Sequence, residues 1–187
     1  MVECRQRILV TALPGSSRAQ ITCLARSCPD APWQTVAEYE GWVGKNGIKA
    51  HRQTGDLTTP AGEFPLELCF GSGERPAGLR MPWRAVTSNS HWVGDPRSPL
   101  FNTWQERDAH SDWDSTLGEW LADYPKEYEW ACVIGFNPPP ADPSAGFAIF
   151  FHVSESPTAG CVGLPKEALC SVLQWLDPDA NPRIQIT

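Results

Sequence analysis

Apolar residues at every second position predict that this chain is built mainly of β-strands. In the segment 63–70 the apolar side chains lie two residues apart, as in a strand with one buried face: Phe64, Leu66, Leu68 and Phe70. The segment 128–136 alternates in the same way. Segments 7–13 and 20–24 flank a Ser-rich turn and predict a hairpin. The segment 146–153 is apolar almost throughout, so we expect a central strand buried on both faces.

Two segments have helical spacing. Apolar residues follow the i, i+3, i+4, i+7 rule in 117–124 and again in 169–176, and Pro165 fits the first turn of the second helix. The segment 71–105 contains Gly, Pro and aromatic residues without periodicity, which predicts a long irregular excursion. We therefore expect a mainly β protein with a few short helices. A single domain would span 1–187, with 1–6 as a disordered end.

Composition excludes several classes of function. Hydrophobic residues make up 41% of the chain and charged residues 20%, which is typical of a folded protein. The net charge is −7 and no stretch is rich in Lys and Arg, so we expect no nucleic-acid partner. The longest apolar runs, such as 147–151, are too short to span a membrane. No signal segment is visible in 1–15, which leaves a cytosolic protein or a removed export segment as alternatives.

The seven cysteines leave two interpretations open. Three disulfides and one free thiol would account for the odd number, whereas most of the cysteines could equally be small buried apolar residues. We expect no metal site, because His51, His91 and His110 lack ligand spacing on a common element. No cofactor is expected either.

The segment 150–164 contains the candidate chemistry. An apolar strand ends near His152, a polar loop follows, and the loop leads to Gly160 and Cys161. A thiol is mostly protonated at neutral pH, and a nearby imidazole can accept its proton during attack on a carbonyl. The amides of Gly160 and Cys161 are candidates to hold the oxyanion, at ~3 kcal/mol per donor. We expect a backbone carbonyl, such as that of Val153, to orient the imidazole.

Several segments together resemble the L,D-transpeptidase catalytic family of YkuD type. The run 150–169, FFHVSESPTAGCVGLPKEAL, resembles the family's active-site segment, with Thr158-Ala159-Gly160-Cys161 in place of its Ser/Thr-x-Gly-Cys motif. GDLTTPAGEFPL at 55–66 is similar to a Gly-Asp-x-x-Thr-Pro-x-Gly-x-Phe segment, and HWVGDPRSPLFN at 91–102 to a Trp-Val-x-Asp-Pro segment. The resemblance covers nearly the whole chain from about residue 7.

This resemblance implies a fold of packed, mixed β-sheets arranged as a β-sandwich with a few short helices. It also implies a bacterial enzyme that acts on peptidoglycan stem peptides. Cys161 would attack the carbonyl between an L-centre and a D-residue, release the terminal D-amino acid and form a thioester, with His152 as base. An amine of another stem would resolve the thioester into a cell-wall cross-link, and carbapenem-type inhibitors would acylate the same thiol. Such an enzyme would work in the cell envelope, either in the periplasm or on the extracellular face.

Three departures from the family pattern concern the substrate. The spacing from His to Cys is shorter, Ala159 stands where many members have a second His, and no Arg closely follows the Cys. We expect substrate contacts from Thr158 and Val162, and from three residues that are also candidates for structural turns: Trp92, Asp95 and Asn102. A hydrolase that uses water as acceptor and a non-catalytic module that binds wall peptide are the alternatives, and a toxin-like effector would also fit a chain without a signal segment.

Overall fold

A computed structural model describes residues 3–107 and 112–187 of the chain. Its strands and helices are β1 Gln6–Thr11, β2 Arg18–Ala25, β3 Gln34–Trp42, β4 Ile48–Lys49, β5 Thr59–Pro60, β6 Gly62–Gly71, β7 Trp83–Ala85, β8 Ser90–Val93, β9 Trp104–Glu106, β10 Gly118–Trp120, η1 Leu121–Asp123, β11 Ala131–Ile134, η2 Pro143–Ala145, β12 Phe150–Val153, β13 Val162–Leu164, α1 Lys166–Trp175, η3 Pro178–Ala180 and β14 Arg183–Ile186. The protein is therefore mainly β, as the alternation predicts.

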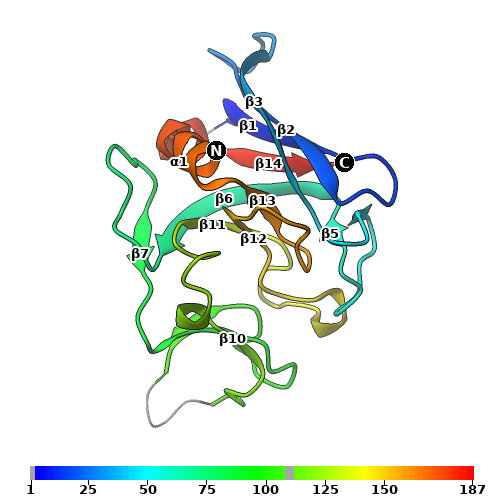
Figure 1. The fold of residues 1–187 in the computed structure, drawn as a ribbon, viewed down its shortest axis with the longest axis vertical. Coiled ribbons are helices and arrows are strands. Elements are labelled where there is room, and N and C mark those ends of the chain that lie inside the picture. The colour runs from blue at the N-terminus through cyan, green and yellow to red at the C-terminus, as the bar shows by residue number, and fades with distance from the viewer. Residues whose placement is uncertain (1–2, 108–111) are drawn as a thin grey trace.

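The main sheet closes on itself as a barrel. In the described residues it has nine strands in the order β11-β12-β13-β3-β2-β1-β14-β6-β7, and β6 also pairs with β11. This pairing closes the ring and leaves β7 outside it (Figure 1). The expected mixed sheet is confirmed, since β12 and β13 are parallel and most other neighbours are antiparallel. The main sheet is a closed ring where a sandwich was expected, because the pairing of β6 with β11 leaves no gap in it.

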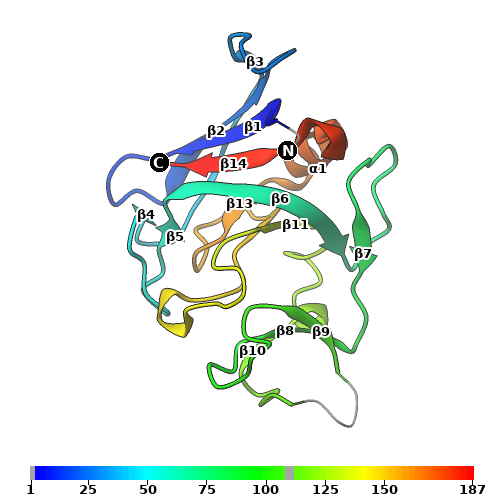
Figure 2. The same cartoon turned by 180° about the vertical axis from the view of Figure 1, so that it is seen from behind.

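A second, small sheet covers one side of the barrel. It consists of β10, β8 and β9, all antiparallel. In both views it lies beyond β6 and β11, on the side away from β1, β2 and β14 (Figures 1 and 2). The segment expected to be irregular, 71–105, thus contains three short strands. Strands this short give too few residues for an alternating pattern to be seen in the sequence.

Two apolar clusters lie on opposite faces of the barrel strands. Successive side chains of a strand point to opposite faces, and in β12 Phe151 belongs to the inner cluster whereas Phe150 belongs to the outer one. The same alternation separates Cys69 from Phe70 in β6. The outer cluster fills the space under the small sheet. This second core explains why 146–153 is apolar almost throughout the segment.

The expected helix at 169–176 is confirmed and the one at 117–124 is wrong. Helix α1 begins after Pro165 and buries the apolar residues that predicted it: Leu169, Val172, Leu173 and Leu176. In 117–124 the chain instead forms β10 and η1. Gly118 has φ 115°, which a helix does not allow, and β10 pairs with β8. Tertiary pairing therefore overrides the helical spacing of this segment.

The strands β11 and β12 are shorter than their apolar patterns. Before β11, the amide of Tyr128 bonds to the carbonyl of Tyr124 at 2.8 Å, so this stretch is a turn. Before β12, Gly146 and Ala148 have φ of 94° and 55°, which interrupts an extended strand. At the N-terminus, the expectation of a disordered end is wrong for Gln6, which begins β1, and Arg5 bonds to Ala180 at 2.8 Å. Met1 and Val2 lie outside the described residues.

Other features of the fold bear on the alternatives left open by the sequence. All seven cysteines are free thiols. In the part of the chain that the structure describes, no helix has both the length and the apolar character needed to cross a membrane. The same residues contain no cluster of metal-binding side chains, and His110 lies outside them.

Candidate active site

His152 and Cys161 line one cavity. Its volume is about 420 Å³, within the range of small-molecule sites. Its walls come from the 52–57 loop, from β10 and the turn that follows it, and from the segments 146–149 and 152–161. The cavity thus lies at the edge of the outer apolar cluster, where the small sheet meets the barrel.

Strand β12 determines which way His152 points. Residues 150 and 152 are on the same face, and Phe150 belongs to the outer cluster. His152 therefore faces the cavity instead of the barrel interior. Its ring packs edge-on against the Tyr128 ring, with centroids 5.6 Å apart, and the residue is only 6% exposed. Packing of this kind fixes the ring.

A backbone carbonyl fixes the tautomer of His152. The Nδ1 atom lies 2.8 Å from the Val153 carbonyl oxygen, as expected from the sequence. Because a carbonyl only accepts hydrogen bonds, Nδ1 carries the hydrogen and donates it. Nε2 of the neutral ring is then the nitrogen with a free lone pair. The arrangement has the orientation that a general base needs.

Cys161 is held by the backbone at the start of β12. The Phe150 amide donates to Sγ at 3.3 Å, and the thiol donates to the Ala148 carbonyl at 3.4 Å. The residue is 8% exposed. Among the described residues no hydrogen bond joins His152 to Cys161, so the two side chains share the cavity without forming the expected direct pair.

Both groups are neutral in this cavity. Burial raises the pKa of the Cys161 thiol to about 12, and Glu119 adds to the rise, while the Phe150 amide and Arg52 lower it. Burial lowers the pKa of His152 below its usual 6.5, against the opposing effects of the Val153 carbonyl and Glu127. The resting site therefore holds a thiol and an imidazole, not a thiolate and an imidazolium.

Thr158 and Thr59 hold the loop that carries the thiol. The Thr158 hydroxyl donates to the Cys161 carbonyl at 2.7 Å and accepts from the Gly160 amide at 3.1 Å. The Thr59 hydroxyl reaches the same carbonyl at 3.3 Å. Thr158 lines the cavity, but its hydroxyl is used within the loop. Because the Gly160 amide already donates to Thr158, the amide of Cys161 is the better candidate for the oxyanion donor.

Asn102 and Trp92 organise the start of β12 and do not line the cavity. The Trp92 indole donates to Asn102 Oδ1 at 2.8 Å, and the Ala148 amide donates to the same oxygen at 3.0 Å. The Asn102 Nδ2 atom donates to the carbonyls of Phe136 and Asn137 at 3.0 and 2.8 Å. Trp92 and Asn102 therefore have a structural role, and they are not positioned for the expected contact with substrate in the cavity.

Asp95 and Val162 also lie outside the cavity lining. Asp95 accepts hydrogen bonds from the Asp114 and Arg97 amides, both at 3.0 Å, and these bonds lower its pKa to about 2. Val162 is fully buried in the inner cluster as part of β13. Asp95 fastens a turn and Val162 fills the core, so neither is positioned to contact substrate in the cavity.

Several residues that line the cavity were not predicted as site residues, among them Arg52, Glu119 and Tyr128. The Tyr128 hydroxyl donates to Glu119 Oε2 at 2.5 Å. Burial raises the pKa of both groups, and Glu119 raises that of Tyr128 further. Tyr128 was part of the alternating pattern and Glu119 part of the expected helix. Their place beside Cys161 depends on the pairing of β10 with β8, which the sequence pattern does not indicate.

Comparison with known proteins identifies no relative for this chain: no family model matches it, and no curated protein sequence matches it significantly.

Proposed function

We propose that the chain is a cysteine acyltransferase of the L,D-transpeptidase type, with Cys161 as nucleophile and His152 as general base. One observation carries this proposal: a thiol and an imidazole with a free Nε2 face one cavity of substrate size. The resemblance of 150–169 and 55–66 to the YkuD-type family supports the substrate class. Peptidoglycan stem peptides would be that substrate, and the cell envelope would be the place of action.

The neutral site fits proton transfer during attack. As Sγ bonds to the carbonyl carbon of the scissile amide, Nε2 of His152 takes the thiol proton. The amide of Cys161 would donate to the oxyanion. When the C–N bond breaks, the imidazolium returns the proton to the departing D-amino acid, which leaves a thioester. A second amine then attacks the thioester carbonyl and loses its proton to Nε2. The C–S bond breaks, and the imidazolium returns that proton to the departing sulfur, which regenerates the Cys161 thiol.

Product analysis tests this function against its alternatives. The protein and its Cys161→Ala variant are incubated with disaccharide-tetrapeptide, and the products are weighed by mass spectrometry. A transferase yields a cross-linked dimer and free D-amino acid, whereas a hydrolase yields only the shortened stem. Both activities should be lost in Cys161→Ala. A module that only binds wall peptide would give no product with either protein, which would contradict the proposal.

A further inference from the structure

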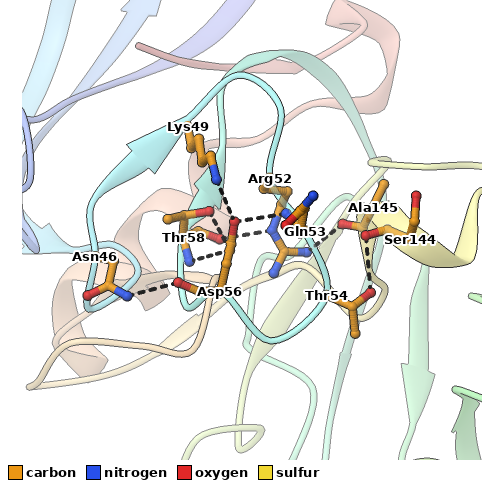
Figure 3. A network of polar contacts seen from close by, with 9 residues as sticks. All are labelled: Asn46, Lys49, Arg52, Gln53, Thr54, Asp56, Thr58, Ser144 and Ala145. Carbon is orange, nitrogen blue, oxygen red and sulfur yellow. Dashed lines mark hydrogen bonds and ion pairs between the residues drawn. The ribbon is translucent and has the colours of Figure 1, made fainter.

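Arg52 is a buried cation held in place by backbone carbonyls. Its Nε donates to the Thr58 carbonyl at 2.9 Å and its Nη1 to the Ala145 carbonyl at 3.0 Å, as Figure 3 shows. The residue is only 8% exposed. The Cζ atom lies 5.8 Å from the centre of the Phe136 ring. These contacts fix the plane of the guanidinium.

The guanidinium makes no ion pair with an acidic side chain, and burial lowers the pKa of Arg52 although the charge of the nearby Asp56 opposes this. None of the ion pairs of the described residues includes Arg52. The nearby Asp56 carboxylate instead accepts from the Gln53 amide at 2.8 Å and from the Thr58 hydroxyl at 2.6 Å, and it pairs with Lys49 at 3.4 Å (Figure 3). Removing a cation from water is costly, and the Asp56 carboxylate is committed to these other partners, so the buried guanidinium of Arg52 indicates an anionic ligand.

The free nitrogen of Arg52 lies beside the nucleophile. Nη2 has no hydrogen-bond partner among the described residues, and Arg52 lines the same cavity as Cys161. A methyl group on Gly160 would lie 3.2 Å from Nη2, and one on Gly146 would lie 2.3 Å from Nη1. The two glycines thus form a slot that the guanidinium fills. A side chain at Gly146 would push the guanidinium out of it.

We propose that Arg52, from the 52–57 loop, binds the terminal carboxylate of the acyl donor through Nη2. The inference rests on the proposed function, because it places the carboxylate on the D-residue that departs from Cys161. A fixed guanidinium suits a carboxylate better than an ammonium does, since its N–H groups have set directions. The ligand class is a peptide with a free C-terminal carboxylate.

The test compares two donor peptides that differ only at the C-terminus. One tetrapeptide stem ends in a carboxylate and the other in a carboxamide, and binding of each to the Cys161→Ala protein is measured by calorimetry. Because the Cys161→Ala protein lacks the nucleophile, the peptides can bind without reacting, and the measured affinity reports recognition alone. We expect the acid to bind about 10- to 100-fold more tightly than the amide, as for one charged hydrogen bond. Equal affinities for the two peptides would overturn the proposal.

Substitutions at Arg52 and Lys49 test whether Arg52 is the residue that causes the preference for the acid over the amide. Arg52→Gln, made in the Cys161→Ala protein, should remove the preference for the acid. Lys49→Gln removes the same charge from the preceding strand β4 but leaves the cavity lining intact, so it should keep the preference. Arg52→Lys loses the bonds to Thr58 and Ala145 as Arg52→Gln does, yet keeps the charge, and it should retain part of the preference. A full preference in folded Arg52→Gln would contradict the assignment.

Failure of the proposed function would look different. If the wild-type protein binds the acid in preference to the amide but turns over neither, the acyltransferase is wrong and the carboxylate site stands. If it turns over both peptides at the same rate, the acyltransferase stands and the role of Arg52 is wrong. Thermal unfolding of each variant shows that the protein compared is folded.

Discussion

At the scale of single residues, the site consists of a neutral Cys161 thiol and a neutral His152 imidazole. The thiol proton is not shared with the imidazole. Burial raises the pKa of Cys161 to about 12 and lowers that of His152. The thiol hydrogen points to the Ala148 carbonyl, 3.4 Å away. A substrate that displaces this contact would let the thiol turn towards Nε2. Reactivity of the thiol would then be coupled to occupancy of the cavity.

This charge state predicts the pH dependence of alkylation at Cys161. Iodoacetamide reacts with the thiolate, so its rate at Cys161 should rise with pH through about pH 9 without a plateau. Peptide-resolved mass spectrometry measures the rate at each cysteine, with the exposed Cys28 as internal reference. The Cys28 thiol should react faster, because it is accessible. A plateau of the Cys161 rate near neutral pH would reveal a preformed thiolate–imidazolium pair and contradict this assignment.

The sequence indicates only part of the site. The spacing in 150–164 correctly places His152 and Cys161 at one cavity and correctly selects the Val153 carbonyl as partner of the imidazole. It cannot indicate Arg52 or Glu119, because each arrives from a distant loop or strand. Thr158 and Gly160 were predicted as site residues, yet their polar groups bond to each other. A motif gives residue types in order, but it does not give their hydrogen-bond partners.

At the scale of elements, Asn102 joins three segments that carry the site. It bonds to Trp92 of β8, to the carbonyls that follow β11 and to the Ala148 amide before β12. Its φ is 60°, a conformation that Asn tolerates better than most residues. Because Ala148 also holds the Cys161 thiol, Asn102 is connected to the nucleophile through a single residue.

We predict that Asn102→Ala lowers the free energy of unfolding by about 3 kcal/mol. The variant leaves buried donors and acceptors unpaired, and it places Ala in a left-handed conformation. Asn102→Gly loses the same hydrogen bonds without the backbone strain, so it should be less damaging by about 1 kcal/mol. Urea unfolding measures both variants. Equal stabilities of wild type and Asn102→Ala would show that this junction does not stabilise the fold.

Element boundaries could be predicted only where local and tertiary forces agree. Helix α1 has apolar spacing, a Pro before its first turn and a buried face, and it forms as predicted. The segment 117–124 has similar spacing, but Gly118 and the edge of β8 make it a strand and a 3₁₀ turn. Competition of this kind is not visible in a single sequence, because the competing partner lies about 25 residues away in the chain.

At the scale of the whole molecule, the two chain ends complete the barrel. Strand β14 lies between β1, to which it is parallel, and β6, to which it is antiparallel. Its inward residues Ile184 and Ile186 are fully buried in the inner cluster. The barrel wall at β12 and β13, which carries the candidate site, is part of the same ring. The last strand therefore supports the site from a distance.

We predict that Ile184→Ala lowers the free energy of unfolding by about 3 kcal/mol, the usual cost of emptying a core position. The neighbouring Gln185 points to the other face and is partly exposed. Gln185→Ala should change stability by less than about 0.5 kcal/mol. Chemical denaturation compares the two. Similar losses for both variants would mean that the β14 backbone, and not its buried face, is what the barrel depends on.

The global fold could be predicted in kind but not in topology. Alternating segments correctly predict a mainly β, mixed arrangement. Closure of the barrel depends on the pairing of β6 with β11, whose alternating patterns would equally suit the two layers of a sandwich. The β12 segment is apolar on both faces, which indicates a second covering layer without identifying it as the small sheet.

The central claim is that Cys161 forms a thioester with the donor stem while His152 removes its proton. The most direct measurement is intact-protein mass spectrometry after brief mixing with tetrapeptide stem and acid quenching. The account predicts an adduct with the mass of the stem less its terminal D-residue, mapped to Cys161, and a large loss of that adduct in His152→Gln. An adduct at another cysteine, or undiminished acylation in His152→Gln, would contradict it.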